Sequence, residues 1–272
     1  MSIVPFDNDY LFIKWGLNTI LMTNFMTHQF DSVLSSDLST KTILLIGRGS
    51  AKKKRFHIGI EALEYIIKEI PNCKLIIISK LSGIEKLQNL VNNLNLENNT
   101  IFNGYSSLPD LYFRNASLNI IPSISEAFPM VLSETKIYGI PNIIIGLDYI
   151  FNAKGGTIII YDDQPEYLAE EAIKIIMKKE YRKKLGKEGR ISMKKFNNDL
   201  IVNDWIELII SIYKGQYYYN KLRKEKKKLS QNDGVNILNN QIKLLKMRYK
   251  IFQNMTRNEF ENYTYLKNIL LY

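Results

Sequence analysis

The sequence is poor in the residues from which covalent cross-links and metal centres are built. It holds one cysteine, Cys73, among 272 residues, which excludes an intramolecular disulfide and a cysteine-based zinc site. Its two histidines, His28 and His57, are too few for a histidine-rich metal centre. These absences suit a reducing compartment. We therefore expect a cytoplasmic chain with no resident metal ion.

Long apolar runs are missing as well. No run approaches the roughly 20 residues that would span a bilayer. The first ten residues carry Asp7 and Asp9, where a secretory signal would be positively charged. The sequence thus predicts a soluble chain that is peripheral to a membrane at most.

Acidic residues are scarce in one part of the chain only. Of 37 Lys and Arg and 27 Asp and Glu, residues 216–272 hold 12 and 4, so residues 1–215 are nearly neutral. A basic tail of this kind favours an anionic partner. The Tyr- and Lys-rich segment 217–228 can stack on nucleobases, pack on the main domain, or lie with the following basic helix on an acidic membrane surface. These alternatives stay open, as does that of a merely solvated helix face.

From Thr42 onward, short β-branched runs alternate with amphipathic segments. Most of the runs are apolar at consecutive residues, as expected for strands covered on both faces. Strand followed by helix, repeated, favours a parallel sheet with right-handed crossovers. The predicted strands are 42–46, 74–79, 100–103, 118–121, 141–145 and 157–161, and the predicted helices are 56–70, 83–94, 107–115, 129–138, 165–179, 180–195 and 199–214.

This pattern predicts an α/β fold with three parts. A lead-in over residues 1–40 contains one strand-like run at 18–22. Residues 41–215 form a Rossmann-like parallel sheet with helices on both faces, and Gly215 closes this domain. Residues 216–272 form a helical C-terminal tail, with a basic helix expected at 235–253.

A glycine-rich and basic segment follows the first predicted strand. It begins with Gly47-Arg48-Gly49-Ser50, and Lys53 and Lys54 stand shortly before the next helix. Ligands of doubly wound sheets bind at the carboxyl ends of the strands, where glycines allow close backbone approach and basic side chains neutralise phosphates. A tight turn with a solvated basic loop is the alternative, because the segment is neither a G-x-G-x-x-G nor a Walker A motif.

A second segment, 125–134, follows the fourth predicted strand and enters a helix at Pro129. Glu126 falls in the loop and Glu134 on the second turn of the helix. The free N–H groups near Pro129 favour an anion, and two carboxylates at this spacing can hold sugar and ribose hydroxyls. Taken alone, the same spacing is typical of surface helix charge. Asp162-Asp163, by contrast, is predicted to be a loop and helix N-terminus and not a metal site.

Together these segments resemble the glycosyltransferase family 4, or glycosyl transferases group 1, of the GT-B superfamily. Their order and spacing over residues 42–215 make the resemblance specific. The matching segments are Ile43-Leu44-Leu45-Ile46-Gly47-Arg48, Lys53-Lys54-Arg55-Phe56, Phe102-Asn103-Gly104-Tyr105, Pro122-Ser123-Ile124-Ser125-Glu126-Ala127-Phe128-Pro129 with Glu134, and Tyr138-Gly139-Ile140-Pro141.

The resemblance implies a role for each matching position. Glu126 and Glu134 are the two carboxylates of the E-x7-E motif, which contact the donor sugar and the ribose hydroxyls. Arg48 and one of Lys53 or Lys54 hold the donor diphosphate and stabilise its departure. The family generally retains the anomeric configuration and needs no tightly bound metal or other cofactor. Further donor-binding positions are Gly47, the backbone of Phe128, Pro129, Met130 and Val131, and Gly104 and Tyr105 beside the nucleobase.

Three departures from the family pattern matter. The loop after Arg48 is one residue longer than usual, which leaves Lys53 and Lys54 as alternatives. Ala127 replaces a frequent glycine and is tolerated if its φ is negative. The acceptor-binding domain is missing: residues 1–40, of which 20–31 resemble its end and linker, are all that precede the first strand.

The sequence therefore predicts the donor-binding half of a retaining glycosyltransferase. Its partners would be a nucleotide sugar and a glycan, lipid or protein acceptor. The alternative is a non-catalytic or partner-dependent module that binds nucleotide sugars and works with another chain supplying the acceptor domain.

Overall fold

The computed structural model describes residues 22–26, 33–105, 110–147, 150 and 152–213. The chain divides into a compact unit over Thr23–Val202 and a second unit made of Met1–Met22 and Asn203–Tyr272. The predicted tail, 216–272, and most of the predicted strand at 18–22 lie outside the described residues. The description below concerns the first unit and the helix that continues beyond it.

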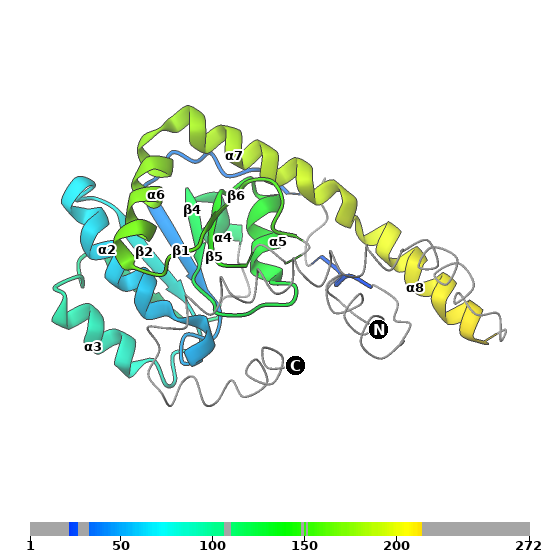
Figure 1. The fold of residues 1–272 in the computed structure, drawn as a ribbon, viewed down its shortest axis with the longest axis horizontal. Helices are drawn as coiled ribbons and strands as arrows, with labels where there is room; N and C mark the ends of the chain where they lie inside the picture. The colour runs from blue at the N-terminus through cyan, green and yellow to red at the C-terminus, as the bar shows by residue number, and fades with distance from the viewer. Residues whose placement is uncertain (1–21, 27–32, 106–109, 148–149, 151, 214–272) are drawn as a thin grey trace, which may run out of the picture. The chain divides into compact units, whose positions relative to one another are not determined.

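Six strands form one parallel sheet in the order β3-β2-β1-β4-β5-β6 (Figure 1). The chain builds the sheet outward from β1 to β3, crosses back to β4, and then builds outward to β6. This doubly wound order confirms the predicted Rossmann-like sheet. The strands are β1 (Thr42–Ile46), β2 (Lys74–Ile78), β3 (Thr100–Asn103), β4 (Leu118–Ile121), β5 (Asn142–Ile145) and β6 (Thr157–Ile160).

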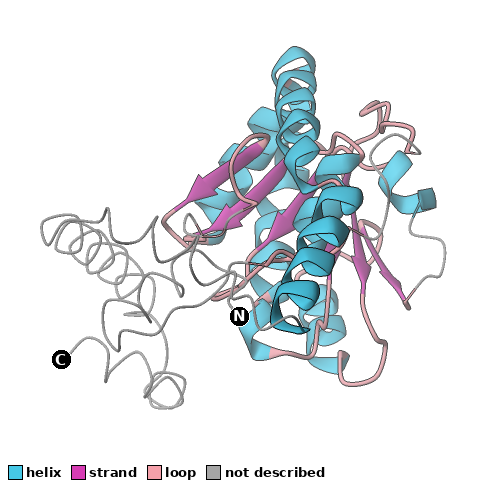
Figure 2. Cartoon of the chain, turned by 90° about the vertical axis from the view of Figure 1, so that its right-hand side faces the viewer, coloured by secondary structure: helices cyan, strands magenta, loops and turns pink. Residues whose placement is uncertain are grey.

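Helices lie on both sides of this sheet (Figures 1 and 2). Each helix predicted between residues 56 and 214 is present, whereas the helix predicted at 235–253 lies outside the described residues. Helix α2 packs against α6 on one side, and α5 packs against α7 on the other. No helix of the described residues is both long and apolar enough to cross a membrane. The elements are η2 (Lys52–Lys54), α2 (Phe56–Glu69), α3 (Glu85–Asn93), α4 (Asp110–Arg114), α5 (Met130–Ile137), α6 (Pro165–Met177), α7 (Lys179–Ser192), η3 (Met193–Phe196) and α8 (Asn198–Tyr213).

The central strands are buried on both faces. Every residue of β4 and β5 is buried, as their consecutive isoleucines predict for strands between two helical layers. One polar pair interrupts this apolar centre. Asn119 on β4 lies beside Asn142 on β5 and donates a hydrogen bond from Nδ2 to Oδ1 of Asn142 at 2.7 Å, and Thr135 of α5 donates to the same oxygen at 2.8 Å.

Glycines allow α7 to pack closely on the loops beneath it. Gly139 follows α5 at φ +71°, and Gly156 precedes β6 at φ +64°. A Cβ added at Gly186 of α7 would collide with the carbonyl oxygen of Gly139, and one at Gly156 would collide with the backbone of Gly189. Backbone therefore meets backbone at both crossings, which sets the position of α7 against α5 and β6.

Residues 33–40 run along the same unit before β1 begins. The N–H of Ser36 donates to the carbonyl of Tyr138 at 2.8 Å, and its hydroxyl donates to the carbonyl of Ala116 at 2.7 Å. The carbonyl of Leu38 accepts two hydrogen bonds from the buried guanidinium of Arg182. This part of the lead-in is thus fastened to the sheet domain. The origin of residues 1–40 as the end of an acceptor domain stays a prediction.

Candidate functional site

The candidate site lies where the winding direction of the sheet reverses. Strands β1 and β4 are neighbours, and their carboxyl ends lead into two loops, residues 47–55 and 122–129. In open α/β sheets this switch point is where ligands bind, because the two loops diverge there and leave a crevice. The glycine-rich basic segment and the segment that begins the E-x7-E motif, far apart in the sequence, are therefore brought together.

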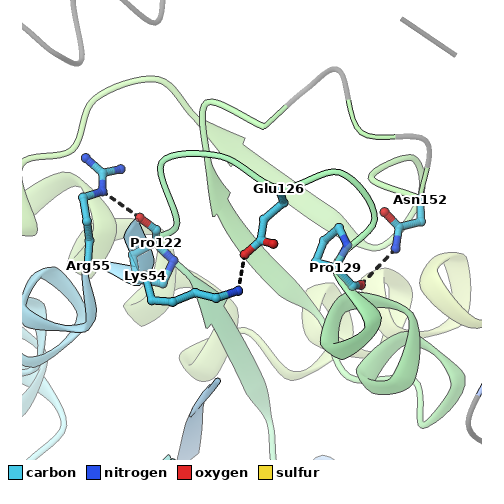
Figure 3. A network of polar contacts seen from close by, with 6 residues as sticks. All are labelled: Lys54, Arg55, Pro122, Glu126, Pro129 and Asn152. Carbon is cyan, nitrogen blue, oxygen red and sulfur yellow. Dashed lines mark hydrogen bonds and ion pairs between the residues drawn. The ribbon is translucent and has the colours of Figure 1, made fainter. Parts of the chain in front are cut away.

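Lys54 of the first loop meets Glu126 of the second (Figure 3). The ammonium Nζ of Lys54 lies 2.5 Å from Oε1 of Glu126, and the two side chains are only 25% and 14% exposed. Solvent screens the attraction between two charges this shielded less than it does on the open surface. The pair brings a cation for phosphate and a carboxylate for a sugar hydroxyl to one place.

The structure distinguishes the two lysines that the sequence left as alternatives. The amine of Lys54 reaches Glu126, whereas exposed Lys53 joins the opposite loop through its backbone, where its carbonyl accepts a hydrogen bond from the N–H of Ile124 at 2.9 Å. Lys54 is therefore the lysine whose geometry fits the predicted diphosphate role. That role itself stays a prediction.

Arg55 was not among the predicted site residues, yet its side chain binds the loop that follows β4 and the loop that precedes α6. It is 5% exposed and adopts the left-handed conformation, with φ 46° and ψ 41°, at the start of α2. Its Nε donates to the carbonyl of Pro122 at 2.8 Å, and its Nη1 lies 2.7 Å from Oδ2 of Asp163 (Figure 3 shows the bond to Pro122). Asp163 lies in the loop before α6, as predicted, and its carboxylate is the partner of Arg55.

The glycines of the first loop allow close backbone approach. Gly47 has a φ of +147°, which L-residues rarely adopt. The N–H of Gly49 donates to Oγ of Ser79 at 2.8 Å, and a Cβ at Gly49 would lie only 3.1 Å from that oxygen. Arg48, between the two glycines, is exposed at the same edge of the sheet. The loop thus presents Arg48 outward while its backbone stays close to β2.

Helix α5 begins beside Glu126. Pro129 is the residue before the helix, so Met130 is the first helical residue, one position later than the sequence predicted. The first N–H groups of a helix have no acceptor within the helix and carry the positive end of its dipole, which favours an anion. Ala127 is not among the residues with positive φ, so the alanine in place of glycine is tolerated as predicted.

The remaining predicted residues lie on this helix or at the same edge of the sheet. Phe128 is buried and packs its ring edge-on against Phe196, with centroids 5.5 Å apart. Met130, Val131 and Glu134 are half-buried on the first turns of α5. Gly104 and the exposed Tyr105 follow β3, which lies two strands from β1 in the sheet.

A buried polar network that the sequence did not predict holds the start of α5. Asn152, 1% exposed, donates from Nδ2 to the carbonyl of Pro129 at 3.1 Å and to Oγ of Ser133 at 2.7 Å (Figure 3 shows the bond to Pro129). Lys136, fully buried, donates from Nζ to the carbonyl of Asn152 at 2.5 Å and to two that follow it. Burial, and secondarily the charge of Lys195, lowers the pKa of Lys136 to about 7.

Comparison with known proteins places the chain in a family. Residues 28–192, more than half of the chain, match the family described as glycosyl transferases group 1. The chain therefore belongs to this family, which confirms the resemblance seen in the motifs.

Relatives and solved structures agree with this assignment. The poly(glycerol-phosphate) alpha-glucosyltransferase of Bacillus subtilis is 25% identical over 168 residues, which cover 60% of this chain and 24% of that relative. Sucrose-phosphate synthase of Thermosynechococcus elongatus superimposes with a TM-score of 0.66 at 20% identity, covering 79% of this chain and 58% of the other. HepE of Anabaena, in complex with UDP and glucose, superimposes with a TM-score of 0.64 at 18% identity, covering 75% of this chain and 60% of the other.

These structural likenesses confirm the predicted fold class, the Rossmann-like sheet of GT-B glycosyltransferases. The chain is shorter than the relatives that it matches. It spans between about a quarter and about half of the length of its curated relatives.

Proposed function

We propose that this chain binds a nucleotide-diphosphate sugar and transfers the sugar, with retention of anomeric configuration, to a glycan, lipid or protein acceptor. The observation that carries the proposal is the meeting of Lys54 and Glu126 at the switch point of the sheet, beside the first turn of α5. Membership of the glycosyl transferases group 1 family supports it.

We assign complementary tasks to the two loops. Arg48 and Lys54 would neutralise the diphosphate, together with the N–H groups at the start of α5. This electrostatic stabilisation matters most as the glycosidic bond breaks and negative charge builds on the leaving group. Glu126 would face the transferred sugar. Glu134, five residues into α5 and half-buried, would hold the ribose hydroxyls.

A uridine nucleotide is the first donor to test. HepE of Anabaena, which shares the fold, was solved with UDP and glucose, and TarM of S. aureus was solved with UDP and alpha-GlcNAc-glycerol. Gly104 and Tyr105 follow β3 at the same edge of the sheet as Lys54, which is where we propose the nucleobase lies.

The experiment is calorimetric titration of the chain with UDP-, GDP- and ADP-sugars. We expect one nucleotide class to bind and the Arg48→Ala and Glu134→Ala variants to bind it at least about tenfold more weakly, as loss of a hydrogen bond to a charged group predicts. Glu188→Ala, which removes an exposed carboxylate from α7, is the matched control and should leave affinity unchanged. Unaltered affinity in both site variants would contradict the proposal.

Retention has a test of its own that needs no acceptor. Slow hydrolysis of the donor releases a free sugar, and NMR identifies the anomer that forms first. An anomer of the same configuration as the donor supports retention, and the opposite anomer rules it out.

A partner-dependent donor-binding module is the second candidate. The chain spans half or less of the length of its curated relatives. Closure of a second domain over the donor excludes water and positions the acceptor, so this candidate predicts donor binding with turnover only when a chain supplying that domain is added. Contact of residues 216–272 with an acidic membrane surface or a nucleic acid also stays a prediction, and it requires binding that weakens steeply with salt.

A further inference from the structure

Three consecutive residues of the first loop are fastened to the loop that carries Glu126. The carbonyl of Lys53 accepts from the N–H of Ile124, the ammonium of Lys54 pairs with Glu126, and the guanidinium of Arg55 donates to the carbonyl of Pro122. The contacts therefore fall at residues 122, 124 and 126 of the second loop. Two loops that carry the opposite charges of the site are joined along their length.

Arg55 differs from the other two in burial and in backbone conformation. It is 5% exposed, and its φ of 46° is one that residues other than glycine rarely adopt. Such a conformation persists only where the surroundings hold it. Here the surroundings are two oxygens from different segments, the carbonyl of Pro122 after β4 and the carboxylate of Asp163 before α6.

The pair formed by Arg55 and Asp163 extends the contact between two helices to the site. Helices α2 and α6 pack against each other, and Tyr65 of α2 donates to Glu166 of α6 at 2.5 Å. Arg55 begins α2 and Asp163 immediately precedes α6, so their ion pair joins the two helices at the edge of the sheet where Lys54 meets Glu126. Lys54, the residue before Arg55, is thereby connected to the packed pair of helices α2 and α6.

We propose that Arg55, held by Asp163, is a positioning residue that sets the geometry between Lys54 and Glu126. Because Nε and Nη1 of Arg55 are already bonded to the protein and the side chain is buried, it acts through its neighbour and not by contacting the donor. The consequence for donor binding rests on the proposed function, whereas the consequence for the Lys54–Glu126 pair does not.

The test is a double-mutant cycle between Lys54→Met and Glu126→Gln, measured as the equilibrium constant for unfolding in denaturant. The cycle yields the coupling, which is the factor by which the interaction between Lys54 and Glu126 changes that equilibrium constant. In the wild-type background we expect a coupling of about fivefold, as for other interacting pairs. The cycle is then repeated in Arg55→Gly and in Asp163→Asn. Glycine accepts the left-handed backbone, and asparagine removes the charge of Asp163 at constant shape, so both variants are expected to fold.

The expected result is that the coupling falls below about twofold in both backgrounds. Changes to the unfolded chain caused by glycine cancel within the cycle, because they affect all four of its corners. Arg55→Lys, which restores a cation facing Asp163, should recover part of the coupling. The matched control is Arg190→Met, since Arg190 donates to the carbonyls of Val33 and of Ile137, the last residue of α5 and thus at the other end of that helix from Glu126. It should lower stability and leave the coupling at about fivefold.

Coupling that is the same in wild type, Arg55→Gly and Asp163→Asn would overturn the proposal, and so would an equal loss in Arg190→Met. A second readout is the dissociation constant for UDP, which should rise about tenfold in Arg55→Gly and stay constant in Arg190→Met. If wild type binds no nucleotide, the proposed function fails, and the double-mutant cycle still decides the role of Arg55.

Discussion

The ammonium of Lys54 lies 2.5 Å from a carboxylate oxygen of Glu126, and the two residues belong to loops that follow neighbouring parallel strands. Such a pair has a consequence for any anion that enters the site. A phosphate oxygen must compete with Glu126 for Lys54, and it also meets the negative charge of Glu126 nearby.

Glu126→Gln should therefore strengthen binding of UDP severalfold while removing the carboxylate that we assign to the sugar. Lys54→Met should weaken UDP binding at least about tenfold, because a charge-assisted bond to phosphate is lost. Calorimetry at fixed ionic strength measures both, with exposed Asp37→Asn as a control. Equal weakening by the two substitutions would show that the pair does not compete with the ligand.

The two glycines of α7, Gly186 and Gly189, should differ in how much their replacement by alanine lowers stability. A Cβ at Gly186 collides with the carbonyl oxygen of Gly139, so Gly186→Ala forces the helix away and should lower the free energy of unfolding by at least about 2 kcal/mol. At Gly189 the nearest atom is Cγ of Lys136 at 3.4 Å, an ordinary contact. Gly189→Ala should change stability by less than about 1 kcal/mol, since alanine also favours the helix. Denaturant unfolding compares the two, and equal effects would contradict the close packing.

Lys136 should make stability depend on pH. Its pKa is about 7 in the folded chain and near the ordinary 10.5 when unfolded, so between these values the unfolded chain binds the extra proton. The free energy of unfolding then rises with pH, by up to about 1.4 kcal/mol per pH unit, and this contribution is lost as pH falls to 7. Burial raises the pKa of Cys73 from 9 to about 12, which acts in the opposite direction above pH 9.

The measurement is therefore made between pH 7 and pH 9. Lys136→Met should abolish the rise in the free energy of unfolding over this interval, whereas exposed Lys187→Met should leave it in place. If the free energy of unfolding of Lys136→Met still rises with pH over this interval, the rise comes from another titratable group.

The positions of the strands and helices could be predicted from local sequence. Runs such as 42–46 and 142–145 are rich in β-branched and apolar residues, and Gly47 and Gly146 follow them directly. Gly139 at φ +71° ends α5 as expected of a glycine after a helix. Local pattern and final structure agree here because each element depends on its own residues.

The partners of the site residues could not be predicted in this way. Arg55 and Asp163 are separated by 108 residues, and a single sequence carries no signal that joins them. Lys136 falls at a helix position that its residue type alone would place on the surface, because lysine is almost never fully buried without partners. The ion pair between Lys54 and Glu126 was not predicted either, although the family resemblance assigned both residues to the donor site.

The asparagine pair between β4 and β5 has a consequence for how the sheet assembles. Both strands are isoleucine-rich and buried on both faces, so a slip of one strand along the other would still place apolar side chains in apolar surroundings. Asn119 and Asn142 remove this degeneracy, because any shifted alignment separates their amides and leaves them without each other inside the core. The two asparagines thus select one register between β4 and β5. That register also sets the relative positions at which the chain leaves β4, toward Glu126, and leaves β5, toward Asn152.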